Sequence, residues 1–256
     1  MKALILAGGF GTRLAEETAL RPKPMVEIGG YPMLWHIMEH YSRHGIKEFV
    51  VCLGYKANYV KKFFIDYSTT LSDFTINLQT NEMFIHSRRS EDWQVTFIDT
   101  GLETMTGGRI KRALREANVE DTFCLTYGDG LSNVDIGKSI IFHKQHEKLA
   151  TVTAVTPPGR FGVLDITENN AVIGFREKFA SDVYRINGGF FVLEPQVGEY
   201  IEGDRSVWEK EPLNKLATED QLKAWVHDGF WHPMDTLRDK NILQEMWDTG
   251  NPPWKK

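Results

Sequence analysis

Short apolar runs alternate with longer amphipathic segments through the first half of this 256-residue chain. The runs have strand length, and the longer segments repeat their apolar residues at helical spacing, as Leu34, Ile37 and Tyr41 do. Such a βαβ series implies a mostly parallel sheet with helices on both faces and ligands at the carboxyl ends of its strands. We therefore expect a Rossmann-like, open α/β sheet. The predicted strands are 2–7, 48–53, 95–99 and 122–127, and the predicted helices are 32–44, 59–67, 107–117 and 134–146.

The second half has closely spaced strand candidates at 151–155, 162–166, 171–177 and 187–193, which predict antiparallel additions to the sheet. Closing helices are predicted at 208–216 and 237–247. Residues 69–94 are polar with apolar patches, which indicates an inserted hairpin or a mobile loop and a candidate oligomer contact. No Pro/Gly/Ser-rich linker divides the chain, so we expect one continuous domain over 1–256.

Composition limits the partners and the compartment. A net charge of −5 and a pI near 5.9 argue against a broad basic face, so nucleic acid is not expected as a partner and phosphate binding should be local. No apolar stretch approaches the roughly 18 residues of a membrane span, and the run at 3–7 is too short for a signal-peptide core. Cys52 and Cys124 each lie in an apolar run, which fits two buried free thiols. We expect a cytoplasmic protein without membrane contact.

A glycine-dense turn follows the first strand, in the sequence Leu6-Ala7-Gly8-Gly9-Phe10-Gly11-Thr12-Arg13-Leu14. Glycines let backbone N–H groups approach an anion with no Cβ in the way, and a following helix N-terminus adds partial positive charge. Arg13, and Lys23 between Pro22 and Pro24, add cations that an ordinary strand-to-helix turn does not need. The pattern favours a polyphosphate site, with an ordinary turn and a surface lysine as the alternatives.

Two common nucleotide-binding signatures do not fit this turn. Its glycine spacing is not G-x-G-x-x-G, and the second strand ends Cys52-Leu53-Gly54-Tyr55 without the carboxylate that a dinucleotide site needs. The chain also contains no G-x-x-x-x-G-K-[ST] sequence. A nicotinamide cofactor and a P-loop NTPase are therefore both disfavoured.

Two aspartates are candidate metal ligands. Asp129 lies between Gly128 and Gly130 directly after the strand at 122–127, where the glycines expose its carboxylate at the ligand-binding edge of the sheet. One or two carboxylates with phosphate oxygens are what Mg²⁺ prefers. Capping of the next helix is the alternative role for Asp129. Asp235 is the natural second ligand, but an aspartate before a helix at Leu237 is also a good N-cap, and both roles stay open.

The turn at 6–14 together with Lys23-Pro24-Met25 resembles the signature of the sugar-1-phosphate nucleotidylyltransferases. These enzymes join a nucleoside triphosphate to a sugar phosphate and release pyrophosphate. Segments 99–101, 106–109, 157–162 and 229–236 narrow the resemblance to members that use CTP and α-D-glucose 1-phosphate and make CDP-glucose. The chain also lacks the glutamine that thymidylyl and uridylyl relatives place before a Gly-Leu-Ala segment. The resemblance implies Mg²⁺ as cofactor and a homo-oligomer, with a hexamer as one form.

The resemblance also carries residue roles over to this sequence. It implies that Arg13, Lys23 and Asp129 are catalytic and that Asp129 and Asp235 hold the metal. The implied nucleotide-binding set is Leu6, Ala7, Gly8, Gly9, Gly11, Thr12, Arg13, Lys23, Thr104, Thr106, Gly108, Arg109 and Gly128. The implied sugar-phosphate-binding set is Gly162, Glu177, Lys178, Asn187, Gly188 and Trp231. The nucleotide-binding half then spans about 1–135, and the added antiparallel, sugar-binding portion about 136–256.

The expected chemistry is direct in-line attack of the sugar phosphate on the α-phosphorus, because no nucleophile with its base is arranged in the chain. Arg13 and the amides of 8–11 are expected on the β- and γ-phosphates, with Lys23 near the reacting phosphorus. The amides and the Thr106 hydroxyl of 106–109 are expected to face the pyrimidine edge. Arg109 as a solvated helix residue and Glu177-Lys178 as an exposed pair remain alternatives. Two alternative functions also remain open. One is the same reaction with UTP, dTTP or another sugar phosphate, and the other is a non-catalytic nucleotide-sugar sensor.

Overall fold

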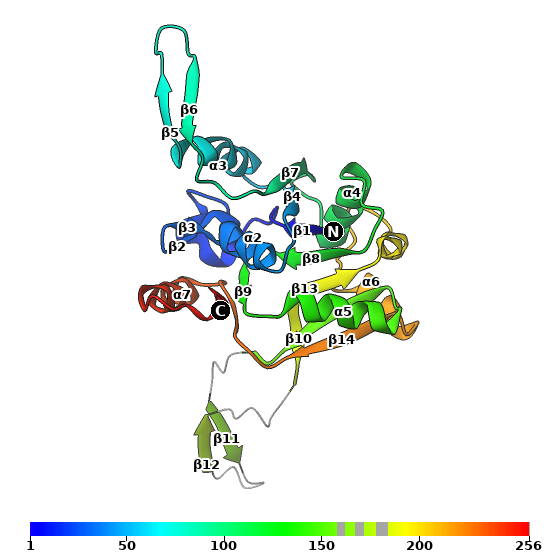
Figure 1. Cartoon of the computed structure of the whole chain (residues 1–256). Coiled ribbons are helices and arrows are strands. Elements are labelled where there is room, and N and C mark those ends of the chain that lie inside the picture. The colour runs from blue at the N-terminus through cyan, green and yellow to red at the C-terminus, as the bar shows by residue number, and fades with distance from the viewer. Residues whose placement is uncertain (158–161, 167–171, 178–183, 256) are drawn as a thin grey trace.

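The computed structural model describes residues 1–157, 162–166, 172–177 and 184–255. A seven-stranded sheet lies at its centre, in the order β14-β10-β13-β8-β1-β4-β7 (Figure 1). β1 pairs in parallel with β4 and β8, β4 with β7, and β10 with β14, whereas β13 runs antiparallel to both β8 and β10. The expected open, mostly parallel α/β sheet is confirmed. Its strands are β1 Lys2–Leu6, β4 Glu48–Leu53, β7 Gln94–Asp99, β8 Phe123–Tyr127, β10 Ala150–Val155, β13 Ile186–Leu193 and β14 Leu222–His227.

Helices cover both faces of this sheet and create two cores. Alternate residues of β1 enter different cores, since Ala3 and Ile5 lie in one and Leu4 and Leu6 in the other. Burial on both faces explains why these strands read as continuous apolar runs. The first core packs against α2 (Met33–Arg43), α3 (Ala57–Thr70), α5 (Ile136–His146) and α7 (Leu237–Asp248), and the second against α4 (Thr106–Glu116) and α6 (Glu211–Thr218).

The two cysteines are buried and free, one in each core, as expected. Burial raises the pKa of each thiol to about 12. Both groups therefore stay protonated and act as small apolar side chains. Short elements complete the chain: α1 Ala15–Thr18, β2 Glu27–Ile28, β3 Tyr31–Pro32, and the 3₁₀ turns Thr12–Leu14, Lys23–Met25, Pro195–Tyr200 and Pro253–Lys255.

The second half departs from expectation in three places. The closing helix predicted at 208–216 begins later, at Glu211, and strand β14 was not predicted. Only β13 is antiparallel within the main sheet, because β11 (Gly162–Ile166) and β12 (Val172–Glu177) form a separate antiparallel pair. The antiparallel addition is therefore partly a hairpin outside the sheet, and Figure 1 shows it lying apart from the main body.

The predicted insertion at 69–94 contains a hairpin over 73–87, which favours the first of the two predicted alternatives. β5 (Asp73–Ile76) and β6 (Met83–Ser87) pair only with each other. The hairpin continues from the end of α3 and projects away from the main sheet, at the opposite end of the molecule from β11 and β12 (Figure 1). We call it the arm. Among the described residues, no helix is both long and apolar enough to cross a bilayer.

Candidate active site

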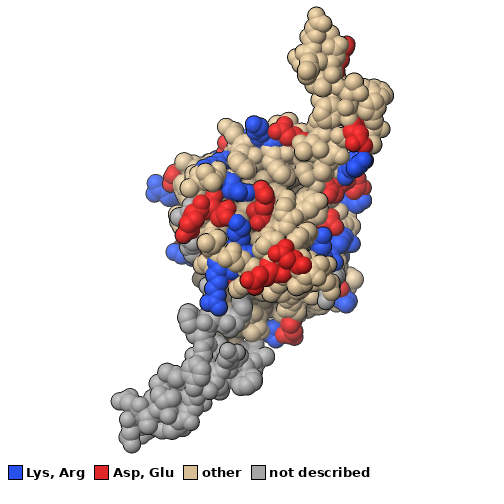
Figure 2. All heavy atoms as spheres, turned by 90° about the vertical axis from the view of Figure 1, so that its left-hand side faces the viewer, with Lys and Arg blue, Asp and Glu red and all other residues tan. Residues whose placement is uncertain are grey.

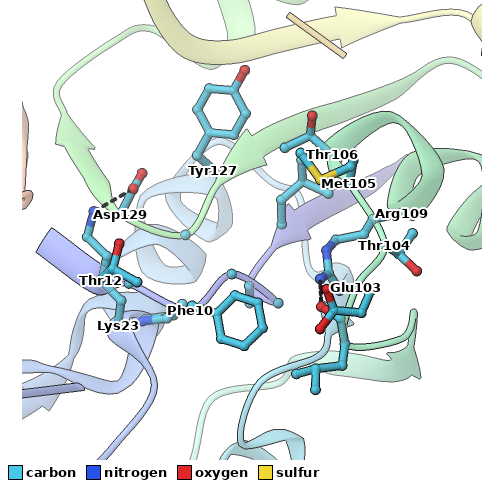
Figure 3. A pocket seen from close by; sticks show the side chains of 18 of the residues that line it. Phe10, Thr12, Lys23, Glu103, Thr104, Met105, Thr106, Arg109, Tyr127 and Asp129 are labelled. Atoms are coloured by element: carbon cyan, nitrogen blue, oxygen red, sulfur yellow. Dashed lines mark hydrogen bonds and ion pairs between the residues drawn. The ribbon is translucent and has the colours of Figure 1, made fainter. Parts of the chain in front are cut away.

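A pocket of about 450 Å³ lies at the carboxyl ends of β1 and β8 (Figure 3). Parallel strands collect ligand-binding groups at this edge, as the sequence predicted. Three segments distant in sequence form most of its walls: the glycine turn, residues 102–106 leading into α4, and Tyr127 at the end of β8 with Gly128 and Asp129 after it. The lining residues are Leu6, Ala7, Gly8, Gly9, Phe10, Gly11, Thr12, Lys23, Pro24, Leu102, Glu103, Thr104, Met105, Thr106, Arg109, Tyr127, Gly128, Asp129 and Asp235.

The glycine turn presents backbone donors without partners. Among the described residues, none accepts a hydrogen bond from the amides of Gly8, Gly9, Phe10 or Gly11. A Cβ on Gly9 would meet nothing within 4 Å, so the protein's own packing does not require glycine there. Unpaired amides around open space at a strand–helix junction are the features of an anion site.

Arg109 holds this turn from beneath. Its guanidinium donates to the Leu53 carbonyl at 3.0 Å, the Thr100 hydroxyl at 2.7 Å and the Leu102 carbonyl at 3.2 Å. A Cβ on Gly8 would lie 2.1 Å from Arg109 Nη1, so only glycine fits above it. The side chain is buried, and the alternative of a solvated helix residue is wrong. Arg109 therefore joins the end of β4 to the segment that follows β7, beside the pocket.

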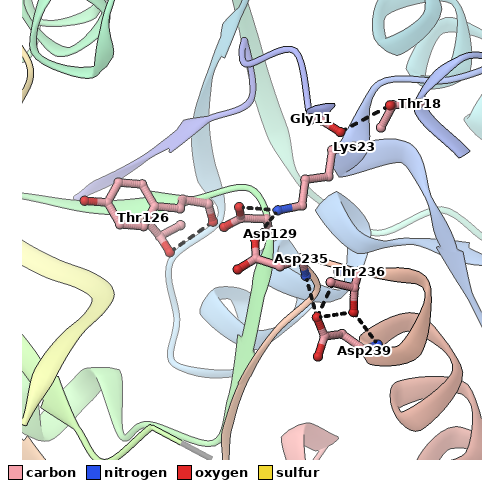
Figure 4. A network of polar contacts seen from close by, with 9 residues as sticks. Gly11, Thr18, Lys23, Thr126, Asp129, Asp235, Thr236 and Asp239 are labelled. Carbon is pink, nitrogen blue, oxygen red and sulfur yellow. Dashed lines mark hydrogen bonds and ion pairs between the residues drawn. The ribbon is translucent and has the colours of Figure 1, made fainter. Parts of the chain in front are cut away.

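Lys23 lies between two carboxylates at the pocket wall (Figure 4). It opens a 3₁₀ turn after the extended Pro22, and its Nζ is 2.8 Å from both Asp129 Oδ2 and Asp235 Oδ1. Burial by itself lowers the pKa of Lys23, but the charges and hydrogen bonds of the two aspartates outweigh it and the pKa is raised. Lys23 is therefore a permanent ammonium inside the pocket, and the surface-lysine alternative is wrong.

A short ladder brings the two aspartates together across 106 positions of sequence. β9 (Gly130–Ser132) follows Asp129 directly and pairs antiparallel with β15 (Trp231–Pro233), which ends two residues before Asp235. The Met234 amide donates to the Asp129 carbonyl at 2.8 Å and closes the end of the ladder. Because the strands are antiparallel, the residue before one and the residue after the other meet at the same end.

Neither aspartate caps a helix. At the start of α7 the cap is Thr236, which forms a capping box with Asp239, and the Asp235 amide also donates to Asp239 Oδ2 at 3.1 Å (Figure 4). Asp135 caps α5, the helix that follows Asp129. The capping alternatives for Asp129 and Asp235 are both wrong, and both carboxylates face Lys23.

The donor set fits a hard divalent cation that also binds phosphate. Two carboxylate oxygens already converge on one cationic atom, Lys23 Nζ, so they are close enough to share a small ion. In the described part of the chain no group of three or more His, Cys, Asp or Glu side chains could hold a metal alone. A two-carboxylate site leaves most of an octahedral shell to ligand oxygens and water, as Mg²⁺ prefers.

The opening of α4 differs from expectation. The amides of Gly107 and Gly108 donate to the Ser206 carbonyl at 2.9 and 3.3 Å, and a Cβ on Gly108 would lie 2.6 Å from Asp204 Cα. The Thr106 hydroxyl donates to Glu209 at 2.7 Å. The expectation that these two amides and the Thr106 hydroxyl proton are free to donate to a ligand is therefore wrong. Thr106 still lines the pocket with Thr104, but Gly108 does not.

Residues predicted on the sugar side lie beside the pocket and not in its lining. Asn187 Nδ2 donates to the hydroxyl of the pocket residue Tyr127 at 3.2 Å, and Asn187 Oδ1 accepts from the Gly189 amide. Trp231 Nε1 donates to the Gly188 carbonyl at 2.7 Å. These internal bonds fix a second wall next to Tyr127, with Trp231 held against β13.

Some of the predicted site residues lie away from the pocket, and others are not among the residues that the structure describes. Gly162 and Glu177 pair with each other at one end of the β11–β12 hairpin, apart from the pocket (Figure 1). Lys178 and residues 158–161 lie outside the described residues, as does the side chain of Arg13. The pocket also contains residues that the sequence reasoning missed, namely Phe10, Pro24, Leu102, Glu103, Met105 and Tyr127. Tyr127 had a usable signal, because it is the last strand residue before the Gly-Asp-Gly turn.

The fold and the pocket are typical of an enzyme that binds phosphate groups at the carboxyl ends of the strands of an α/β sheet. The nucleotidyl transferase family model matches residues 2–236, and the chain belongs to this family. Glucose-1-phosphate cytidylyltransferase from Salmonella typhi is 53% identical over 255 residues, covering 100% of this chain and 99% of that one. The enzyme of the same name from Salmonella typhimurium is also 53% identical over the same span. The family resemblance seen in the sequence is thus confirmed.

A solved structure supports the fold assignment. HddC from Yersinia pseudotuberculosis, complexed with GMP-PN, superposes with a TM-score of 0.68 at 25% identity. The superposition covers 96% of this chain and 99% of that chain.

Proposed function

We propose that this protein makes CDP-glucose and pyrophosphate from CTP and α-D-glucose 1-phosphate. The observation that carries the proposal is the pairing of Lys23 with Asp129 and Asp235 beside the unpaired amides of the glycine turn, in one pocket. Full-length identity of 53% to curated glucose-1-phosphate cytidylyltransferases supports the choice of base and sugar.

The residues act by electrostatics. Attack of the sugar phosphate on the α-phosphorus builds negative charge on the departing pyrophosphate. The amides of 8–11 and Arg13 are assigned to the β- and γ-phosphates, where prealigned donors stabilise that charge. Lys23 is assigned to the reacting phosphate, since its raised pKa keeps it charged at neutral pH. The lysine would exchange its carboxylate partners for phosphate oxygens.

Asp129 and Asp235 are the proposed Mg²⁺ ligands. The ion supplies charge neutralisation on the triphosphate when bound. Removal of divalent ions with EDTA is expected to abolish turnover, and added Mg²⁺ to restore it. Restoration by monovalent salt alone would contradict the assignment.

The sugar phosphate is assigned to the second wall. This wall lies beside Tyr127 and consists of Asn187, Gly188 and Trp231. The remaining proposed contacts of the sugar phosphate are Gly162, Glu177 and Lys178. In this scheme residues 1–135 form the nucleotide-binding half and 136–256 the sugar-binding half of one domain.

The test is pyrophosphate release from CTP, glucose 1-phosphate and Mg²⁺, with single-substrate controls. We expect kcat/KM to be highest for CTP in a panel with UTP, dTTP and GTP. Preference for another triphosphate or another sugar phosphate would establish the alternative substrates instead. Tight CTP binding without turnover across a panel of sugar phosphates would establish a sensor.

The arm is the proposed contact of a homo-oligomer. An isolated two-stranded hairpin is marginally stable in water, yet this one exposes large apolar side chains, Leu78 by 84% and Phe84 by 67%. On the face that Figure 2 shows, the arm is almost free of charged side chains, whereas Lys, Arg, Asp and Glu intermix over the body. Light scattering should give a mass above one chain, and Leu78→Ser with Phe84→Ser should lower it.

A further inference from the structure

An exposed carboxylate outside the pocket accepts hydrogen bonds from two pocket residues. Glu209 Oε2 accepts from the Thr106 hydroxyl at 2.7 Å, and Oε1 accepts from the Tyr127 hydroxyl. Thr106 begins α4 and Tyr127 ends β8, so one side chain ties two separate pocket walls together. Glu209 itself does not line the pocket.

Tyr127 is fixed at several points. Its hydroxyl accepts from Asn187 Nδ2 at 3.2 Å, and its ring packs over Gly189, where a Cβ would lie 2.6 Å from ring atom Cδ2. Gly189 also has a φ of +79°, which favours glycine.

The bonds form one continuous chain. The Trp208 amide donates to the Thr106 hydroxyl at 2.9 Å, Thr106 and Tyr127 donate to Glu209, and Asn187 donates to Tyr127. A hydroxyl has a single proton, so neither Thr106 nor Tyr127 has one left for a ligand. Their role in the pocket is therefore one of shape and position. The chain runs from the proposed nucleotide wall to the proposed sugar wall.

We propose that Glu209 is a positioning residue for both substrates. By accepting from Thr106 and Tyr127 it sets the spacing between the wall that holds the nucleotide and the wall that holds the sugar phosphate. The proposal rests on the proposed function for the identity of the two substrates. Glu209 touches no reacting atom, so its loss acts on the binding of both substrates more than on the chemical step.

The experiment compares Glu209→Ala, Glu209→Gln and the matched control Glu211→Gln, which removes the same charge two residues away. Hydrogen bonds to charged groups justify an expected rise of about tenfold in the KM of each substrate for Glu209→Ala, with kcat changed by less than about threefold. Glu209→Gln keeps one acceptor oxygen, so it should show a smaller rise. Melting temperatures should fall only slightly for Glu209→Ala and less for Glu209→Gln, because Glu209 is exposed and water can reach the freed hydroxyls, so the variants remain folded in the assay.

A second experiment tests whether Glu209 acts through these two hydrogen bonds. In a Thr106→Val, Tyr127→Phe background, which lacks both donors, Glu209→Ala should have no further effect on either KM. Unchanged KM values, a change in only one KM, or an additive effect in that background would each overturn the proposal.

The wild-type reaction separates this proposal from the proposed function. The assay is run with CTP, UTP, dTTP and GTP, and the variants are compared with whichever triphosphate the wild type prefers. Preference for a base other than cytosine overturns the CTP assignment but leaves the Glu209 comparison intact. If no pair is turned over, calorimetric binding of each triphosphate and of glucose 1-phosphate gives the same comparison.

Discussion

Two glycine-containing segments lie at the pocket, and their backbone amides differ in whether they have partners within the protein. The amides of the turn at 8–11 have no partner among the described residues, and a Cβ on Gly9 would meet nothing within 4 Å. At 106–109 the amides of Gly107 and Gly108 are bonded to Ser206, and a Cβ on Gly108 would collide with Asp204. The first segment is open to a ligand at Gly9, although Gly8 in the same turn packs against Arg109. The second segment admits another part of the chain.

The difference teaches how to distinguish a binding glycine from a packing glycine. In a binding turn the missing Cβ leaves space beside unpaired donors, which an anion can fill. In a packing turn the missing Cβ lets a neighbouring backbone approach, and the donors are already paired. The predictions below test this distinction, beginning with the cationic group beside the first segment.

The largest effect is expected where the glycine turn meets the charged cluster. Lys23→Ala and Asp129→Asn should each lower kcat by at least about a hundredfold, because the first removes a cation beside the reacting phosphates and the second removes a proposed ligand of the Mg²⁺ that neutralises them. Steady-state pyrophosphate release measures this, with the exposed Lys144→Ala as control. Near-normal turnover in either variant would show that the first segment is not the catalytic one.

Gly108→Ala should act on stability. The added Cβ would lie 2.6 Å from Asp204 Cα and 2.7 Å from its carbonyl oxygen, so the backbone must shift. Overpacking of this kind costs about 1–3 kcal/mol in the free energy of unfolding. The matched control in urea denaturation is Gly203→Ala. Gly203 directly precedes Asp204, and a Cβ there would have nothing within 4 Å. Equal stability of the two variants would refute a packing role for Gly108.

Gly9→Ala should act on binding alone. Its Cβ meets no protein atom, so the melting temperature should stay at the wild-type value. It would stand where phosphate is expected, and we expect the KM of the nucleotide to rise about tenfold, which corresponds to about 1.4 kcal/mol. Destabilisation without a change in KM would reverse the comparison between the two segments.

The smallest effect concerns α2, which packs on the first core. Burial lowers the pKa of His36 to about 4 and of His40 to about 3, whereas unfolded histidine protonates near 6.5. The unfolded chain then binds more protons below this pH, so stability falls as pH drops from about 6.5 towards 4.

The expected loss is about 1 kcal/mol per histidine between about pH 6.5 and 5.5, measured by urea denaturation. Replacing His40 with Gln should reduce the slope of stability against pH, whereas the exposed His86→Gln should not. Identical slopes in all three proteins would contradict the assignment.

The sequence predicted most of the sheet because its strands are buried on both faces, which leaves a strong apolar signal in runs such as Phe49–Leu53. β14 was missed because Lys223 and His227 interrupt its apolar pattern at the edge of the sheet. Its partner β10 lies 72 residues earlier, so local pattern alone gives no pairing signal.

Within the site, local chemistry identified Lys23 and Asp129 because their flanking prolines and glycines are unusual. It could not decide Asp235, since Asp235 and Thr236 are both competent helix caps by residue type. It could not place Arg109 either, because that side chain is held by carbonyls of residues 53 and 102, which no spacing rule connects to it. Glu209 is invisible to sequence reasoning for the same reason.

The ladder between β9 and β15 also has a consequence for how the protein is made. Ribosomes deliver the glycine turn, Lys23 and Asp129 early, but the second carboxylate follows only after residues 133–230 have been synthesised and β15 has paired with β9. A nascent or prematurely terminated chain therefore carries an incomplete reactive centre. We therefore expect a chain that ends before residue 231 to show no pyrophosphate release, because it lacks both β15 and Asp235.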